Sequence, residues 1–400
     1  MGEDVTMQQT AHRARSQRRQ GALAVLRHVH AHPAATRADV ARALGLSSGS
    51  ATEITARLKA ARLVAEADPR PTGERGRPSP ALVAHPRGPL VCVVDIGHEH
   101  WRVATVELGG RIAGLESGRH PDRDADAVLD HLRGKVAAVR RRYGPRVRAV
   151  SVAVAGTVRG GTVMQASGMG WSEVDLRRLL PGSGTPLLVG NDASLSGLAE
   201  ARRGVGVGAR VVLHLTVEVG VGGILVVDGR PVDGATGAGG EFGHMPFGDP
   251  ARACPCGAHG CWDLEVDGRA MARVLGQPPP RDPRTTAERT LRAAAGGDPS
   301  ARAAVAAAAR ALGRGVGGLV NALDPDVVSL SGLAIELATT AADDLNAGYR
   351  AGLMRFRRAD PPPLLSSTLG PLSPVTGAAE AAFDALLTDE GLESWLADTG

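Results

Sequence analysis

The chain has 400 residues and a mass of 41.1 kDa, which is too long for one ordinary domain and enough for two or three. Hydrophobic residues make up 43% and charged residues 22%, which excludes a wholly disordered or fibrous chain. The sequence contains neither a run of eighteen apolar residues nor a basic-then-apolar N-terminal segment. We therefore expect no membrane span, no secretion signal and a cytoplasmic location.

The net charge of +4 is distributed unevenly along the chain. Residues 1–90 hold 14 Arg and Lys against 7 Asp and Glu, a net charge of +7. The remaining 310 residues hold 32 against 35, a net charge of −3. This asymmetry predicts a small module that faces nucleic acid or another anionic surface, joined to a nearly neutral body.

The basic module has the pattern of a winged helix-turn-helix. Apolar spacing and capping residues predict three helices followed by two short strands, over residues 18–32, 37–44, 47–61, 63–66 and 81–84. Thr36 caps the second helix, and Gly45 closes it in a tight turn before the third helix. Residues 1–17 are polar and unpatterned, and we expect a loose arm there.

Two groups of residues in this module are candidates for DNA contacts. The third helix carries small polar side chains, and the Pro/Gly/Arg loop between the strands carries arginines that suit the negative potential of a minor groove. The predicted contacts are Ser48, Ser50, Thr52, Thr55, Arg75 and Arg77. The alternative is a helical protein-interaction domain with solvent-exposed arginines.

After a linker at residues 85–88, strand and helix patterns alternate. The apolar run at residues 90–94 reads as a buried strand, and further strands are expected near residues 147–154, 211–216 and 327–330. Helices are expected over residues 124–143, 193–203, 286–295, 299–322 and 376–388. This alternation predicts an α/β body whose length favours two lobes.

Four residues of the body have the spacing of a metal site. His244 is followed by Cys254, Cys256 and Cys261 in the pattern His-x9-Cys-x-Cys-x4-Cys. Three thiolates and one imidazole make a closed tetrahedral set that zinc prefers, so the predicted role of the ion is structural. The alternative is a group of free cysteines in a reducing cytoplasm.

The motif around these ligands, Glu-x-Gly-His followed by Cys-x-Cys-Gly-x-x-Gly-Cys, strongly resembles the ROK family of repressors, open reading frames and sugar kinases. The resemblance implies an actin-like or hexokinase-like ATPase fold of the ribonuclease H-like type, with two lobes and a cleft. We expect a DNA-binding domain over residues 18–85, one lobe over 89–190 and a second over 191–388, with the zinc insertion at 244–261. The last helix is expected to return to the first lobe.

The resemblance also implies a sugar site. Asn191 and Asp192 match the positions that contact sugar hydroxyls, where the Asp is the catalytic base in kinases. Glu241 and His244 match a sugar-contacting Glu and the His that touches both sugar and zinc. As simpler alternatives, Asp192 could cap the following helix and Glu241 could be a solvated loop acid.

Two positions depart from the sugar site of the family. Gly168 replaces an Asn in the stretch that precedes Trp171, and Asp263 stands where the family has a Glu two residues after the last zinc Cys. Loss of one amide that bonds a ligand hydroxyl costs about 1 kcal/mol. A sugar ligand remains the expectation, with an altered identity or affinity.

The two phosphate loops depart further. Residues 95–100 read Asp-Ile-Gly-His-Glu-His where a second Gly and a Thr are expected. Residues 218–224 begin with Glu218 and lack the family's Thr, and Ser331-Gly332 replaces a Gly-Gly pair. Carboxylates beside a polyphosphate are repulsive, which weighs against ATP binding.

Together these features predict a transcriptional regulator of the ROK type, most simply a repressor, that binds a double-stranded DNA operator as a homodimer or homotetramer. A sugar-like effector would control it and Asp192 would be a vestigial base, so no kinase activity is expected. The alternatives are an ATP-dependent sugar kinase, or a regulator with a non-sugar effector or none.

Overall fold

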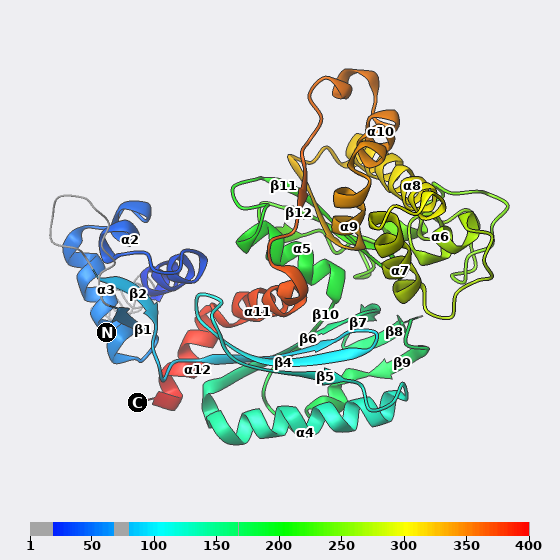
Figure 1. The fold of residues 1–400 in the computed structure, drawn as a ribbon. Helices are drawn as coiled ribbons and strands as arrows, with labels where there is room; N and C mark the ends of the chain where they lie inside the picture. Colours follow the sequence, from blue (N-terminus) through cyan, green and yellow to red (C-terminus); the bar gives the residue numbers. More distant parts are fainter. Residues whose placement is uncertain (1–18, 68–79, 167, 400) are drawn as a thin grey trace, which may run out of the picture. The chain divides into compact units, whose positions relative to one another are not determined.

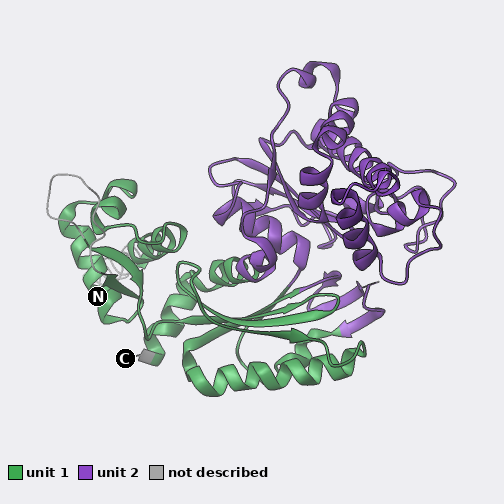
Figure 2. Cartoon of the chain, in the orientation of Figure 1, with its two compact units in different colours: residues 1–153, 175–189, 378–400 green, residues 154–174, 190–377 purple. Residues whose placement is uncertain are grey.

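The structure is a computed structural model that describes residues 19–67, 80–166 and 168–399. The chain divides into two compact units (Figure 2). Unit 1 comprises residues 1–153, 175–189 and 378–400, and unit 2 comprises residues 154–174 and 190–377. The N-terminal module and the last residues of the chain therefore belong to the same unit.

The N-terminal module has the helix and strand order of a winged helix-turn-helix. A first helix over residues 19–31 is followed by α2 (Arg37–Ala43), α3 (Ser48–Ala60), β1 (Val64–Ala67) and β2 (Ala81–Ala84). Thr36 caps α2 reciprocally with Asp39, and Gly45 takes a positive φ of 62° in the turn before α3. β1 and β2 pair antiparallel and form the ribbon.

The rest of unit 1 is built on a five-stranded sheet in the order β10-β6-β3-β4-β5 (Figure 1). Its strands are β3 (Leu90–Ile96), β4 (His100–Glu107), β5 (Ile112–Arg119), β6 (Val147–Val154) and β10 (Leu187–Asn191). All seven residues of β3 are buried, as its apolar run predicts for a central strand. Helix α4 (Ala125–Tyr143) packs its apolar stripe against β3 and β4.

Helices α11 (Ser373–Leu386) and α12 (Asp389–Thr399) bring the chain end to the N-terminal module. His30 of the first helix accepts a hydrogen bond from the Gly109 amide at Nδ1, so its Nε2–H is free to donate to Glu380, 3.3 Å away. The Phe383 ring lies 4.6 Å from the His30 ring, and the Trp395 indole donates to a carbonyl at the end of α3. These contacts join the module to the rest of unit 1.

Unit 2 is built on a second five-stranded sheet, in the order β13-β12-β11-β14-β15. Its strands are β11 (Val211–Glu218), β12 (Gly220–Val227), β13 (Arg230–Pro231), β14 (Val327–Gly332) and β15 (Leu364–Ser366). A small separate sheet contains β7 (Thr157–Arg159), β8 (Thr162–Ala166) and β9 (Trp171–Asp175). The α-helices of unit 2 are α5 (Asp192–Arg203), α6 (Gly268–Val274), α7 (Pro283–Ala295), α8 (Pro299–Leu323), α9 (Leu333–Thr340) and α10 (Ala342–Gly352).

Short 3-10 helices complete the described chain. They are η1 (Gly144–Arg146), η2 (Leu176–Leu179), η3 (Phe242–His244), η4 (Trp262–Glu265), η5 (Arg355–Arg358) and η6 (Gly370–Leu372). Two of them pack against β12 and each other: η3, which contains the predicted metal ligand His244, and η4, which follows Cys261.

Helix α8 is long and apolar enough to cross a membrane by length and composition. Two thirds of its most apolar window is buried, and its residues form the centre of the main core of unit 2. The helix therefore has the packing expected of a core helix.

Candidate effector site and metal centre

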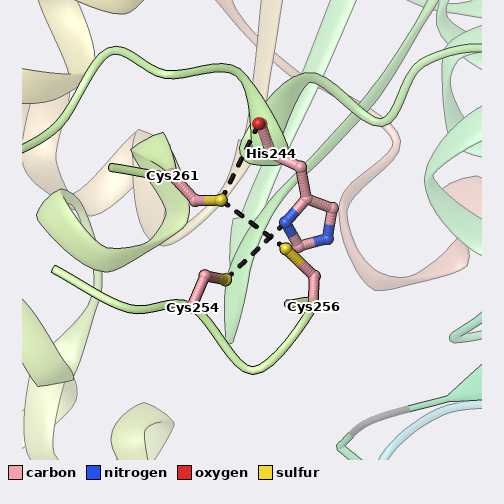
Figure 3. A group of neighbouring side chains, drawn as sticks. All are labelled: His244, Cys254, Cys256 and Cys261. Atoms are coloured by element: carbon pink, nitrogen blue, oxygen red, sulfur yellow. Dashed lines mark hydrogen bonds between the residues drawn. The ribbon is translucent and has the colours of Figure 1, made fainter. Parts of the chain in front are cut away.

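The structure brings the four predicted metal ligands together (Figure 3). Their ligand atoms all lie within 4.8 Å of one another. The Sγ atoms of Cys256 and Cys261 are 3.6 Å apart, and the Nδ1 atom of His244 lies 3.9 Å from the Sγ of Cys254. Gly257 and Gly260 adopt positive φ values of 95° and 69°, which let the loop turn between the ligands.

These separations fit a shared metal ion. A tetrahedral zinc with Zn–S bonds of about 2.3 Å holds two sulfurs about 3.8 Å apart, whereas a disulfide brings them to about 2.05 Å. The distance between Cys256 and Cys261 matches the first arrangement. Because the protein supplies all four ligands, the set leaves no open coordination position for a substrate.

The cluster is anchored to the core of unit 2. Trp262, which follows the last cysteine, is 1% exposed, and its indole donates to the Ala311 carbonyl in α8. A methyl group on Gly315 would lie 2.1 Å from the same indole, so the ring fits tightly against α8. A metal bound by these ligands would fix a loop that is already tied to α8.

His244 connects the metal ligands to the predicted sugar site. Its Nδ1 faces the cysteines, while its Nε2 lies 3.9 Å from a carboxylate oxygen of Glu241. A metal on Nδ1 would leave the proton on Nε2, directed to the side of Glu241.

Two adjacent residues, Gly156 and Thr157, form hydrogen bonds with the predicted sugar-binding residues Asn191 and Glu241. Asn191 caps α5 with its Oδ1 and donates from Nδ2 to the Gly156 carbonyl, and the next residue, Thr157, donates its hydroxyl to Glu241 at 2.8 Å. Asp192 is the first residue of α5, and its Oδ1 accepts from the Ala193 amide. Thr157 was not among the residues that the sequence singled out, because its role depends on a contact 84 residues away.

The contacts of Asp263 differ from those of the other predicted sugar-binding residues. Its Oδ1 accepts from the Val221 amide at 2.6 Å, and its Oδ2 lies 3.8 Å from His244 Nδ1. A methyl group on Gly243 would lie 1.9 Å from the same carboxylate. The carboxylate therefore braces η3 against β12, and a direct contact of Asp263 with a sugar stays a prediction.

Both acids of the first phosphate loop are paired with arginines, and Glu99 accepts a hydrogen bond from Arg119 at 2.6 Å. Asp95 is 2% exposed, and Arg102 of the neighbouring strand donates to its carboxylate at 2.6 Å. Burial raises the pKa of Asp95, and the Arg102 guanidinium opposes that shift. In the same loop, the Gly97 amide is occupied by the His100 carbonyl, and His120 bonds the Gly97 carbonyl.

The second phosphate loop holds an ion-pair cluster. Arg284 donates to Glu218 at 2.5 Å and to Glu288 at 2.8 Å, and it lies 3.3 Å from Glu336. A methyl group on Gly332 would lie 2.6 Å from a carboxylate oxygen of Glu218. The Glu218 side chain thus lies against Gly332, in the pair that departs from the family pattern.

The residues predicted to contact DNA fall into three groups: exposed residues, a buried residue, and residues outside the described ranges. Ser48, Ser50 and Thr52 are exposed on α3. Thr55 is instead buried at 2% exposure, because it lies on the face of α3 that packs into the domain. Arg75 and Arg77 lie outside the described residues.

Comparisons with known protein families identify the family of the chain. The sequence model of the ROK family matches residues 91–384, which span both phosphate loops and the metal ligands. The chain belongs to the ROK family. A model of the MarR family matches residues 18–76, the winged-helix module ahead of the ROK body.

Curated relatives include both enzymes and regulators. The chain is 27% identical over 312 residues to a glucokinase of Streptomyces coelicolor, covering 73% of this chain and 97% of the enzyme. It is 21% identical over 320 residues to a xylose repressor of Bacillus subtilis, covering 78% of this chain and 82% of the repressor. The alignment with the repressor is longer than the stretch of this chain that the ROK model matches.

Solved structures confirm the predicted fold. A ROK family transcriptional regulator, described as a homologue of the Escherichia coli MLC protein, superposes with a TM-score of 0.74 at 24% identity and covers 95% of this chain and 99% of its own. A ROK glucokinase from Streptomyces griseus, in complex with glucose and AMPPNP, gives a TM-score of 0.62 at 27% identity and covers 74% of this chain and 99% of its own. A winged helix followed by a ROK body is the organisation of a ROK transcriptional regulator, as the sequence predicts.

Proposed function

We propose that this ROK regulator is a sequence-specific repressor whose binding to operator DNA is controlled by a sugar-like effector, and that it has no kinase activity. The observation that carries the proposal is the position of His244, with one ring nitrogen toward the cysteines and the other toward Glu241. The xylose repressors and the glucose complex among its relatives support a sugar ligand and a repressor role.

The proposed effector site lies within unit 2 and consists of Asn191, Asp192, Glu241 and His244, with Thr157 as a positioning residue. Carboxylate and amide oxygens accept hydrogen bonds from sugar hydroxyls, and Asn191 and Glu241 are held by the adjacent residues Gly156 and Thr157. We assign zinc to the four metal ligands, where it fixes the orientation of His244 and supplies no chemistry of its own.

The absence of kinase activity is argued from the two phosphate loops. In a hexokinase-like fold the phosphates of ATP need free amides, hydroxyls and cations around them. Here the Glu99 carboxylate of the first loop is paired with Arg119, and the Glu218 carboxylate of the second loop lies against Gly332 and is paired with Arg284. These groups would place negative charge beside a polyphosphate, and both arginines are already engaged.

A sugar kinase is the second candidate, because Asp192 keeps the position of the catalytic base and the glucokinase relative covers most of the ROK body. Purified protein, ATP and a panel of pentoses, hexoses and N-acetylhexosamines separate the two. We expect sugar binding by calorimetry without ADP formation, and loss of sugar binding in Asp192→Asn. Sugar-dependent ADP formation that Asp192→Asn abolishes would establish the kinase instead.

Helix α11 is the proposed connection between the effector site and the DNA-binding domain. Within unit 2, Ser373 bonds Glu200 of α5, and Gly377 lies so close that a methyl group there would be 1.8 Å from the Leu195 carbonyl of α5. Asn191 of the proposed effector site caps the N-terminus of α5. Within unit 1, the same helix contacts His30 through Glu380.

We therefore expect Glu380→Gln to leave sugar binding unchanged and to reduce the effect of the sugar on DNA affinity. The carboxylate is 2% exposed, and replacing it by an amide weakens its charged contact with the His30 ring while keeping its shape. An undiminished sugar response in this variant would remove α11 from the mechanism.

We further propose DNA contacts by Ser48, Ser50 and Thr52 on α3 and by Arg75 and Arg77 of the wing, in a cytoplasmic homodimer or homotetramer. Thr55 is not among them because it is buried. Arg75→Ala and Arg77→Ala are expected to weaken DNA binding and to lower its salt dependence. Unchanged affinity at matched salt would exclude the wing.

A further inference from the structure

The outward face of α3 has a composition that the predicted serine and threonine contacts do not explain. Ala51, Thr55 and Leu58 form its buried side. The residues one helical turn apart on the opposite side are Gly49, Glu53, Ala56 and Ala60, and all four are exposed. Glu53 is the one long side chain in that row.

The Glu53 carboxylate is available for a ligand. Among the described residues, the Glu53 carboxylate makes no ion pair or hydrogen bond, although Arg57 lies one turn further along the helix, where such pairs commonly form. The other cation at this end of α3, Lys59, is paired with Glu66. Within the described part of the chain, Glu53 is therefore an unpaired carboxylate at the centre of the exposed face.

The neighbours of Glu53 allow close approach to a surface. Gly49 precedes it by one turn and has open space around it, with the nearest atom to an added methyl group at 3.9 Å. Ala56 follows it by three residues and carries only a methyl group. A surface that meets this face can reach the helix backbone on both sides of the carboxylate.

In helix-turn-helix proteins the helix after the turn lies in the major groove, with residues of its N-terminal half at base edges. A carboxylate there loses water and faces the negative potential of the phosphates, so it is tolerated only where a donor meets it. The amino group of cytosine N4 is the major-groove donor that Glu characteristically accepts from.

We propose that Glu53 is a specificity-determining residue of the DNA-binding domain, and that it accepts a hydrogen bond from a cytosine N4 amino group in the operator. This inference rests on the proposed DNA-binding function and adds a base contact to it. The small flanking residues let the helix sit deep enough for the Glu53 side chain to reach the base edge.

The test is selection of bound DNA from a random library by the full-length chain, followed by affinity measurements on single-base variants of the selected site. We compare the wild type with Glu53→Gln and Glu53→Ala. Glu390→Gln on α12 is the matched control, because it removes one exposed carboxylate without touching α3. Thermal unfolding verifies that all four chains are folded.

We expect the wild type to require a C·G pair at one position of the site, with a loss of about tenfold in affinity when that cytosine is replaced. Glu53→Ala should lose the requirement at that position alone, and Glu53→Gln should shift it toward adenine, which Gln recognises. Glu390→Gln should select the wild-type site.

The experiment distinguishes failure of the Glu53 base contact from failure of the proposed DNA-binding function. If the wild type enriches a sequence and both Glu53 variants enrich the same sequence with the same base penalties, Glu53 does not read a base, while DNA binding stands. If the wild type enriches no sequence at all, the proposed DNA-binding function fails, and the base contact fails with it.

Discussion

Removal of the metal should destabilise unit 2 by an amount that the structure allows us to estimate. Structural zinc in small proteins binds with an apparent free energy of about 10–16 kcal/mol, and the lower value corresponds to a Kd of about 50 nM. At a free zinc concentration about 100-fold above that Kd, binding stabilises the folded state by about 2.7 kcal/mol. Unit 2 contains about 210 residues, and in a domain of that size each 1 kcal/mol shifts Tm by about 2–4 °C.

We therefore expect the Tm of unit 2 to fall by about 5–11 °C when zinc is removed with a chelator, and to recover when zinc is restored. Cys256→Ser should bind less zinc and lose most of this difference. Hydrogen exchange of residues 242–265 gives the local readout, and mass spectrometry of the metal gives the stoichiometry, expected to be one zinc per chain.

The matched control is Cys92→Ala, since Cys92 is buried in β3 of unit 1 and is not a ligand. It should keep the full zinc content and the full zinc-dependent shift. A wild-type chain that unfolds at the same temperature with and without zinc, or that retains no zinc after purification in its presence, would refute the assignment of the four ligands.

Three further predictions follow from packing and charge. Gly377→Ala should lose about 1–3 kcal/mol of stability to overpacking against the Leu195 carbonyl, whereas Gly184→Ala, which has open space, should be neutral in urea unfolding. Phe383→Ala should cost about 3–5 kcal/mol in unit 1 and weaken DNA binding while leaving calorimetric sugar binding unchanged; equal loss of both would contradict the separate roles of the units. Burial lowers the pKa of His214 to about 3, so the unfolded state binds the extra proton between that value and pH 6.5. Stability should fall in that window as pH is lowered, by about 1.4 kcal/mol per pH unit, and His214→Gln should flatten this slope in urea titrations at pH 7, 6 and 5.

The sequence predicted the features that depend on neighbouring residues. Thr36 and Gly45 mark the ends of α2 by local capping and backbone geometry, and the structure places both in those roles. The spacing of Cys254, Cys256 and Cys261 within one short loop predicted that their sulfurs would converge. Such features can be predicted without knowledge of the fold because the interacting groups are close in the chain.

The contacts in the second phosphate loop and the proposed effector site lie between distant residues and were not predictable in the same way. Arg284 reaches Glu218 across 66 residues, and Thr157 reaches Glu241 across 84. The carboxylates in the phosphate loops were recognised from the family pattern, but their arginine partners required the structure. Thr55 was assigned to DNA because its residue type fits, whereas its side chain lies with Ala51 and Leu58 on the buried face of α3.

The most direct test of the account is the effect of sugars on DNA affinity. With the DNA site selected by the wild type, fluorescence anisotropy is measured for the wild type and Asp192→Asn across a panel of pentoses and hexoses. We predict that at least one sugar weakens DNA binding by the wild type, and that Asp192→Asn binds the DNA equally well but ignores the sugar. The account would be contradicted if no sugar changed the affinity of the wild type, or if Asp192→Asn responded to the sugar as the wild type does.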